Sequence, residues 1–298
     1  MKAPTPKIAG IGEILWDMLP NGGRLGGAPN NFACHCQQLG GESYPVSCVG
    51  DDALGKRALA ELEQLGVSSK FVQQVTTHLT GQVQISLNME GKATYQILVD
   101  MAWDHLHFTP ELRNLAASLD AICFGSLAQR FPVTRETIRL VLQEMPEKAL
   151  RIFDINLRAP FYSREQIEES LGYATVLKLS DDELPVLSGY YGLEGSPIAR
   201  LTALRERFDL DLVAYTRGAN GSVLIGANET DETPGIDIDV VDSIGAGDSF
   251  TAALCMGLLN GWPLSRTNQF ANQVAAFVCS QNGATPKFPA ELSLTHDQ

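Results

Sequence analysis

The chain has 298 residues and a formal net charge of −13, because 35 acidic residues outnumber 22 basic ones. An excess of negative charge on this scale argues against nucleic acid and anionic membranes as partners. The sequence holds no run of 18 apolar residues and no apolar N-terminal segment before a cleavage site, so we expect a cytoplasmic protein.

Strand and helix patterns alternate through most of the chain. An apolar strand that begins at Lys7 is followed by a helix that opens at Pro29 and ends at Gly40. Further along, the expected strands are 121–124, 151–155, 176–179, 212–215 and 222–225, and the expected helices include 134–144, 198–208 and 267–281. Repeated strand-then-helix units predict an α/β fold with a mostly parallel central sheet covered by helices on both faces. Ligands of such sheets bind beyond the carboxyl ends of the strands.

One segment breaks this alternation. Val83, Ile85 and Leu87 alternate with polar residues, and a second alternating run covers 93–99. With a turn at Asn88–Gly91 between them, the two runs predict a β-hairpin with one dry face and one wet face. Because the hairpin lies between α/β units, we interpret it as part of a small β layer set over the main domain.

The stretch from Val240 to Phe250 carries the strongest chemical signal. An apolar extended pair runs into a turn of small residues, Gly245, Ala246 and Gly247, and Asp248 stands where a helix begins. The free N–H groups at a helix N-terminus suit an anion, and small residues let a ligand approach them closely. Asp248 either caps its own helix or takes a proton from a substrate hydroxyl while the N–H groups hold a phosphoryl group.

The familiar nucleotide and metal motifs are incomplete. Gly50-x-x-x-x-Gly55-Lys56 nearly matches a P-loop, but Arg57 replaces the Ser or Thr that would hold magnesium. Leu15 stands where the dinucleotide-binding fingerprint needs a glycine. The five histidines show no spacing typical of metal ligands. A bound nucleotide must therefore be held in another way.

Six blocks of the sequence, in order, resemble the ribokinase-like (pfkB) carbohydrate kinases. The two signatures are the segments 26–33 (Gly-Gly-Ala-Pro-Asn-Asn-Phe-Ala) and 242–248 (Asp-Ser-Ile-Gly-Ala-Gly-Asp). Between or beside them stand Gly12-Glu13-Ile14-Leu15-x-Asp17, Asp154-x-Asn156-x-Arg158, Lys178-x-x-x-x-Glu183 and Thr216-x-Gly218-x-x-Gly221. These four blocks are most similar to those of fructokinases. The resemblance covers nearly the whole chain.

The resemblance implies an ATP-dependent sugar kinase, with fructose as the first expected acceptor. Asp248 would be the general base, Gly245, Ala246 and Gly247 would line the anion hole, and Arg158 would meet the transferring phosphate. Asp17, Gly27 and Asn31 would bind sugar hydroxyls, and Glu183 would act through water on Mg²⁺. The nucleotide would be bound by Lys178, Thr216, Gly218, Gly221, Asn272 and Gly283.

The resemblance also implies a ribokinase-like three-layer α/β/α domain over residues 1–298, with a small β-sheet lid built from about 13–25 and 80–107. Paired lid edges would make a homodimer. Ser243 and Ile244 differ from the usual residues before the anion hole, and so does Ser180 before Glu183, which leaves a K⁺ site and the metal position open. Alternatives are a kinase for ribose, 2-keto-3-deoxygluconate or a nucleoside, and a sugar- or nucleotide-binding regulator of the same fold without turnover.

Overall fold

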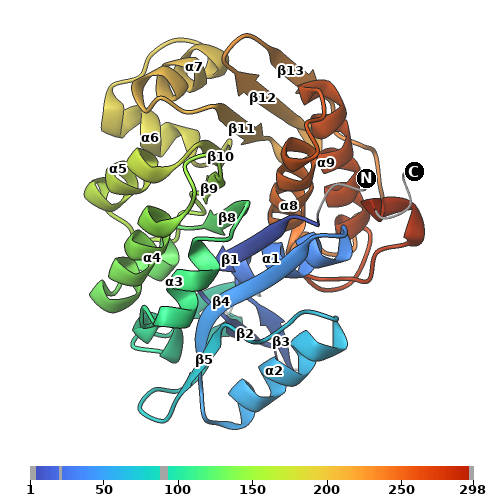
Figure 1. Ribbon diagram of the computed structural model, residues 1–298. Helices are drawn as coiled ribbons and strands as arrows, with labels where there is room; N and C mark the ends of the chain where they lie inside the picture. Colours follow the sequence, from blue (N-terminus) through green and yellow to red (C-terminus); the bar gives the residue numbers. More distant parts are fainter. Residues whose placement is uncertain (1–4, 20–21, 88–92, 295–298) are drawn as a thin grey trace.

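The computed structural model describes residues 5–19, 22–87 and 93–294 (Figure 1). Its strands are β1 (Lys7–Ile11), β2 (Leu15–Leu19), β3 (Gly22–Gly26), β4 (Glu42–Gly50), β5 (Val72–Val75), β6 (Gly81–Leu87), β7 (Ala93–Ile97), β8 (Ala121–Phe124), β9 (Leu150–Asp154), β10 (Val176–Ser180), β11 (Leu212–Thr216), β12 (Ser222–Gly226) and β13 (Thr230–Thr233). Its α-helices are α1 (Ala28–Gln38), α2 (Ala53–Gln64), α3 (Pro110–Ala116), α4 (Pro132–Glu144), α5 (Arg164–Tyr173), α6 (Leu184–Tyr191), α7 (Pro197–Arg207), α8 (Ala246–Leu259) and α9 (Leu264–Cys279). Within these residues, no helix combines the length and apolar character needed to cross a membrane.

A nine-stranded sheet forms the centre of the molecule, in the order β13-β12-β11-β10-β9-β8-β1-β4-β5. The strands from β11 to β5 are parallel, and only β12 and β13 at one edge run antiparallel to their neighbours. The central strands are buried along most of their length, as the continuous apolar runs predict. The predicted α/β fold class is confirmed.

Helices cover both faces of this sheet, which makes three layers (Figure 1). Helices α1, α8 and α9 lie together on one face and share a core with Ile8, Cys123 and Leu224. The other face packs against α3 to α7 through a larger core that includes Phe124 and Phe153. Short αβ and βα connections bring the polar residues that follow the strands to one end of the sheet.

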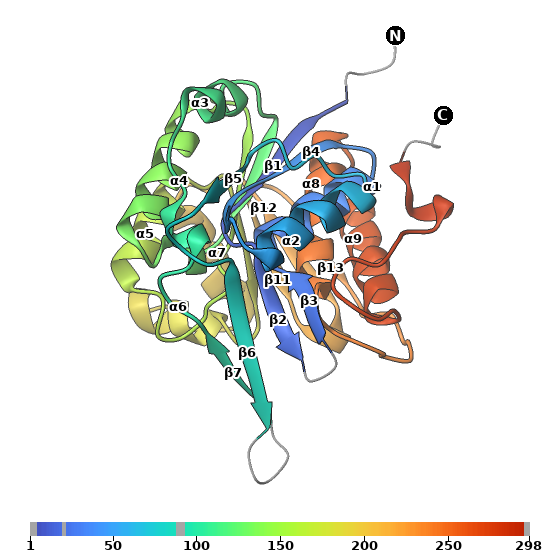
Figure 2. The same ribbon diagram turned by 90° about the horizontal axis from the view of Figure 1, so that it is seen from below.

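A second, four-stranded sheet has the order β3-β2-β6-β7 and projects from one end of the molecule (Figure 2). The hairpin expected from the alternating pattern is present as β6 and β7, whereas the expected turn at 88–91 lies outside the described residues. Trp16 of β2 is fully buried and packs with α2, which ties this sheet to the main body. The segment 98–107 does not extend the sheet, because Ala102–His105 forms a 3₁₀ helix whose Trp103 is buried in the main core.

Close contact between β1 and the start of α1 depends on a glycine. A Cβ atom at Gly10 would lie 1.9 Å from the backbone oxygen of Pro29. Only a residue without a side chain therefore lets the first turn of α1 sit directly on β1. This packing fixes the N-terminus of α1 at the carboxyl end of the sheet.

We expect Gly10→Ala to lower the free energy of unfolding by about 3 kcal/mol, because the added methyl group overlaps rigid backbone. Gly172→Ala is the matched control: it lies on α5 with no atom within 4 Å of the new Cβ. There alanine should raise the free energy of unfolding by about 0.5 to 1 kcal/mol. Urea denaturation of both variants measures the difference, and equal stability would contradict the close-packing argument.

Candidate active site

The N-termini of α1 and α8 meet at the carboxyl end of the central sheet. The side-chain amide Nδ2 of Asn31 on α1 donates a hydrogen bond of 2.8 Å to Oδ2 of Asp248 on α8. Both helices begin at glycines with positive φ, 109° at Gly27 and 82° at Gly245. The structure thus brings together residues that stand 217 positions apart in the chain.

The first turn of α8 presents uncommitted backbone donors. No side chain caps this helix, and within the described residues the N–H groups of Gly247 and Asp248 donate no hydrogen bond to the protein. A Cβ atom at Gly245 would lie 2.3 Å from the carbonyl oxygen of Ala284, so the turn packs tightly against the loop at Gly283. The positive end of the helix dipole and these N–H groups suit an anion such as a phosphoryl group.

Burial brings the pKa values of the Asp248 and Glu13 carboxyl groups close to neutrality. Burial raises the pKa of Asp248 to about 6, against the opposing effects of the Asn31 amide, Lys178 and Arg158. Burial also raises the pKa of Glu13 to about 7, with Asp248 contributing in the same direction. Oε1 of Glu13 accepts from the N–H of Ala28 at 3.2 Å, whereas its buried Oε2 has no hydrogen-bond partner among the residues that the structure describes. A carboxylate with a pKa near neutrality is suited to accept a proton.

A buried ion pair lies beneath the first turn of α8. Nζ of Lys178 on β10 donates to Oδ1 of Asp154 on β9 at 3.0 Å, and the hydroxyl of Thr251 donates to Oδ2 of Asp154. Burial by itself lowers the pKa of Lys178, but the carboxylates of Asp154 and Glu183 outweigh it and raise that pKa, which keeps the ammonium charged. A Cβ atom at Gly247 would lie 3.2 Å from Nζ. The site therefore holds local positive charge in an acidic protein.

Glu183 fastens the loop that carries Arg158. Its Oε1 accepts from the N–H of Leu157 at 2.8 Å, and its Oε2 accepts from the N–H and hydroxyl of Ser180 at 2.8 and 3.0 Å. The Arg158 side chain is exposed and, among the described residues, forms no ion pair. Its positive charge nevertheless acts on the carboxyl groups of Glu13, Asp17 and Asp248.

Asp17 on β2 extends the site toward the small sheet. Burial raises the pKa of its carboxyl group, and the charges of Arg158 and Arg24 oppose that shift. Arg24 on β3 is held by an ion pair of 2.9 Å with Asp242, which also accepts from the N–H groups of Ile244 and Gly283. The small sheet therefore contacts the turn before α8 directly.

The residues predicted to bind the nucleotide divide into two groups. Thr216 ends β11, Gly218 and Gly221 follow that strand, and Gly283 lies beside Asp242, so these four line the same end of the sheet. Asn272 on α9 differs: its amide donates to Ser222 Oγ at 2.6 Å and to the carbonyl of Asn268 at 2.8 Å. Those donors are already committed within the protein.

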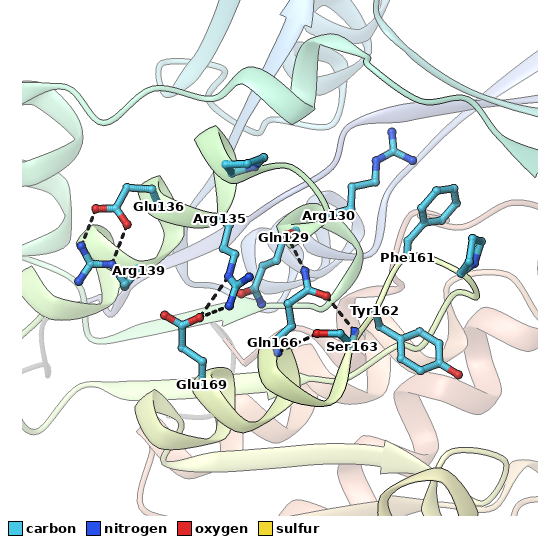
Figure 3. Close-up of a pocket in the computed structure, with 12 residues that line it drawn as sticks. Gln129, Arg130, Arg135, Glu136, Arg139, Phe161, Tyr162, Ser163, Gln166 and Glu169 are labelled. Atoms are coloured by element: carbon cyan, nitrogen blue, oxygen red, sulfur yellow. Dashed lines mark hydrogen bonds and ion pairs between the residues drawn. The ribbon is translucent and has the colours of Figure 1, made fainter. Parts of the chain in front are cut away.

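A groove of about 680 Å³ lies away from these residues, between α4, α5 and the segment 160–163 (Figure 3). Its three arginines are already paired: Arg130 with Asp104, Arg135 with Glu169, and Arg139 with Glu136. No residue predicted for the site lines it. We therefore place the candidate active site at the helix N-termini rather than in this groove.

The sequence reasoning did not single out Glu13 and Asp154 as site residues, although both lie in the quoted motifs. Glu13 could have been found from its position between Gly12 and Ile14 in an apolar run, because burying a carboxyl group without a partner costs free energy. Asp154 ends a buried strand, where a charge must have a partner.

The chain resembles known proteins over most of its length. Residues 22–291 match the profile described as pfkB family carbohydrate kinase. A fructokinase from Klebsiella pneumoniae is 31% identical over 263 residues, which cover 85% of this chain and 84% of that protein. The structure of aminoimidazole riboside kinase from Salmonella enterica, complexed with aminoimidazole riboside and an ATP analog, has 26% identity and a TM-score of 0.79, covering 96% of this chain and 98% of the other. A structure from Escherichia coli that holds ATP and Mg²⁺ shares the fold, with a TM-score of 0.82, 20% identity and 95% of each chain covered.

We expect Lys178→Met to lower the free energy of unfolding by about 3 to 5 kcal/mol, because it leaves the Asp154 carboxylate buried without its partner. Lys56→Met is the control, since Lys56 pairs with Asp51 in full solvent and its loss should leave stability almost unchanged. Chemical denaturation of both variants provides the test. Similar denaturation midpoints would show that the buried pair does not hold the site together.

Proposed function

Because the chain belongs to the PfkB family of carbohydrate kinases and is a phosphotransferase with an alcohol acceptor, we propose that it phosphorylates fructose with Asp248 as the general base. The observation that carries this proposal is the hydrogen-bonded Asp248 carboxyl with its raised pKa, placed beside uncommitted N–H donors at the start of α8. A proton acceptor and an anion site side by side are what transfer of a phosphoryl group to a hydroxyl requires.

Each side chain has a distinct task in this proposal. Asp17, Asn31 and the backbone at Gly27 orient the sugar hydroxyls through acceptors and donors of fixed geometry. Asp248 takes the proton of the attacking hydroxyl as the new bond to phosphorus forms. The backbone of residues 245–247, where the N–H of Gly247 donates to none of the described residues, and the guanidinium of Arg158 receive the phosphoryl oxygens, on which negative charge gathers.

ATP and Mg²⁺ are bound in related kinase structures, and the residues here fit them. Uncommitted N–H groups and Lys178 suit phosphate, while Oε1 of Glu183 accepts only one hydrogen bond and keeps a lone pair for a metal-bound water. When bound, Mg²⁺ neutralises charge on the phosphates. Thr216, Gly218, Gly221 and Gly283 would hold the nucleotide, and Asn272 would support that surface through Ser222 and Asn268.

The small sheet would serve as a lid over the sugar, which keeps water from competing as the acceptor. Its outer strands β3 and β7 are edges of that sheet, so the homodimer through paired lids remains a prediction. The cytoplasmic location and the K⁺ site also remain predictions. Asp242 already holds Arg24 and two N–H groups, so a K⁺ ion there would share its carboxylate with a guanidinium.

Fructose stands first because the sequence blocks are most similar to those of fructokinases and because the Klebsiella relative carries that name. Ribosides remain candidate acceptors, because the similar Salmonella structure is complexed with aminoimidazole riboside. Ribose, 2-keto-3-deoxygluconate and nucleosides are the remaining acceptors. A binding protein without turnover is the alternative of another class.

Coupled ADP release with MgATP tests the proposal against fructose, ribose, glucose, 2-keto-3-deoxygluconate, adenosine and aminoimidazole riboside. We expect turnover with fructose to exceed the others. Asp248→Asn should lower kcat by about 100- to 10,000-fold, because the amide cannot accept the proton, while MgATP affinity is nearly kept. Running the assay in potassium chloride and in choline chloride tests the K⁺ requirement.

The exposed Asp211 supplies the control: it directly precedes β11, at the opposite end of the sheet from the helix N-termini, so Asp211→Asn removes the same charge and should leave kcat unchanged. An Asp248→Asn enzyme as active as the wild type would refute the assignment of the base. Sugar binding without product from any acceptor would favour the non-catalytic alternative.

The pH dependence follows from the pKa of Asp248. Below about 6 its carboxyl is protonated and cannot take a proton, so kcat/KM should fall about tenfold per pH unit there. Initial rates across the acidic range measure this limb, which should persist in Glu13→Gln. If the acidic fall in kcat/KM disappeared in Glu13→Gln, Glu13 rather than Asp248 would be the general base.

A further inference from the structure

Three polar side chains outside the active site converge where the small sheet joins the main body. His78 lies just before β6, Asp100 lies just after β7, and His105 ends the following 3₁₀ helix. One imidazole or carboxylate atom from each lies within 4.8 Å of the others. We propose that this cluster binds one transition-metal ion of the Zn²⁺ class, which fastens together the two chain segments that enter and leave the small sheet.

The donor atoms already lie close to one another. Nε2 of His105 lies 2.7 Å from Oδ1 of Asp100, and Nε2 of His78 lies 3.5 Å from the same oxygen. In a tetrahedral zinc site with bonds of about 2.0–2.1 Å, neighbouring ligand atoms are separated by about 3.4 Å. The imidazole rings stack with their centroids 3.6 Å apart and with 16° between their planes, so each ring must turn before both nitrogens can point at one ion.

The surroundings support ligation. Nδ1 of His78 lies 2.9 Å from the hydroxyl of Thr77, the kind of outer contact that fixes a ligating imidazole. Asp100 is 60% exposed, so water can reach the ion and fill a fourth position. The nearby guanidinium of Arg130 is neutralised by a buried ion pair with Asp104, through bonds of 2.8 and 2.7 Å. It therefore does not repel a cation strongly.

The donor set selects the kind of metal. Two imidazoles and one carboxylate suit Zn²⁺, Ni²⁺ or Co²⁺, whereas Mg²⁺ prefers oxygen ligands alone. The ion would thus be distinct from the Mg²⁺ that accompanies ATP.

The location gives the ion a structural consequence. The N–H of Ala102 donates to the carbonyl of Leu79 at 2.8 Å, so the two segments already touch at this point. Asp52 anchors the entering segment through the N–H and hydroxyl of Thr80, and Arg130 anchors the leaving segment through the carbonyl of Leu98. A metal bound by His78 and His105 adds a coordinate link between the two anchored segments.

Metal binding to the full chain, freed of metal with a chelator, tests the proposal without any turnover assay. Calorimetric titration with Zn²⁺ at neutral pH should give one site per chain, and Co²⁺ should give the visible absorption of a tetrahedral complex. His78→Ala and His105→Ala should each weaken Zn²⁺ binding by about 100-fold or more. Zn²⁺ should also raise the Tm of the wild type but not of these variants.

His107→Ala is the matched control, because this exposed histidine stands two residues from His105 and outside the cluster. It should bind Zn²⁺ as the wild type does. If an alanine variant fails to fold, Asp100→Asn carries the test, since it keeps the shape of the side chain and removes its charge. Absent binding in the wild type, equal binding in all variants, or loss shared by His107→Ala would each overturn the proposal.

Discussion

The meeting of two helix N-termini is the constraint on which the site depends. The positive ends of α1 and α8 point into the same region, and such ends repel each other unless negative charge lies between them. Asp248, hydrogen-bonded to Asn31, supplies that charge in the folded protein. Burial disfavours the charged form of a carboxyl group here, and it therefore raises the pKa values of Asp248 and Glu13. A phosphoryl group brought to this point therefore enters a field that the two helices and Lys178 have already arranged, in a chain whose overall charge would otherwise repel it.

Buried charges tie the central sheet to the helix that bears Asp248. Asp154 is the last residue of β9, and Lys178 is its register partner on the neighbouring parallel strand β10. Parallel pairing places them side by side without a long loop, and Thr251 of α8 satisfies the remaining carboxylate oxygen. The pair is thus held by the sheet and by the helix together, so the helix that bears Asp248 cannot shift without disturbing a buried ion pair.

Much of this could be predicted from the sequence, for identifiable reasons. Strand-then-helix alternation leads to a parallel sheet, and parallel strands bring the residues after them to one end, which is why Asn31, Arg158 and Asp248 could be expected together. Contacts between side chains that are distant in the sequence were harder to predict. His78 stands 22 positions before Asp100, so no local spacing revealed the cluster with His105. Asn272 shows a second limit of prediction from sequence. Its amide is of a type that can bind a nucleotide, but the structure directs that donor inward, to Ser222.

The bonds of Glu183 have a mechanical consequence. One carboxylate oxygen holds the N–H of Leu157, and the other holds Ser180 at the end of β10. The same carboxylate therefore holds both the loop that bears Arg158 and the end of β10. A ligand that attracts the Glu183 carboxylate therefore either displaces that loop as well or breaks the hydrogen bond that the N–H of Leu157 donates to Glu183. Under the proposed function, binding of the nucleotide with Mg²⁺ beside Glu183 would thus displace Arg158, the side chain proposed to meet the transferring phosphate.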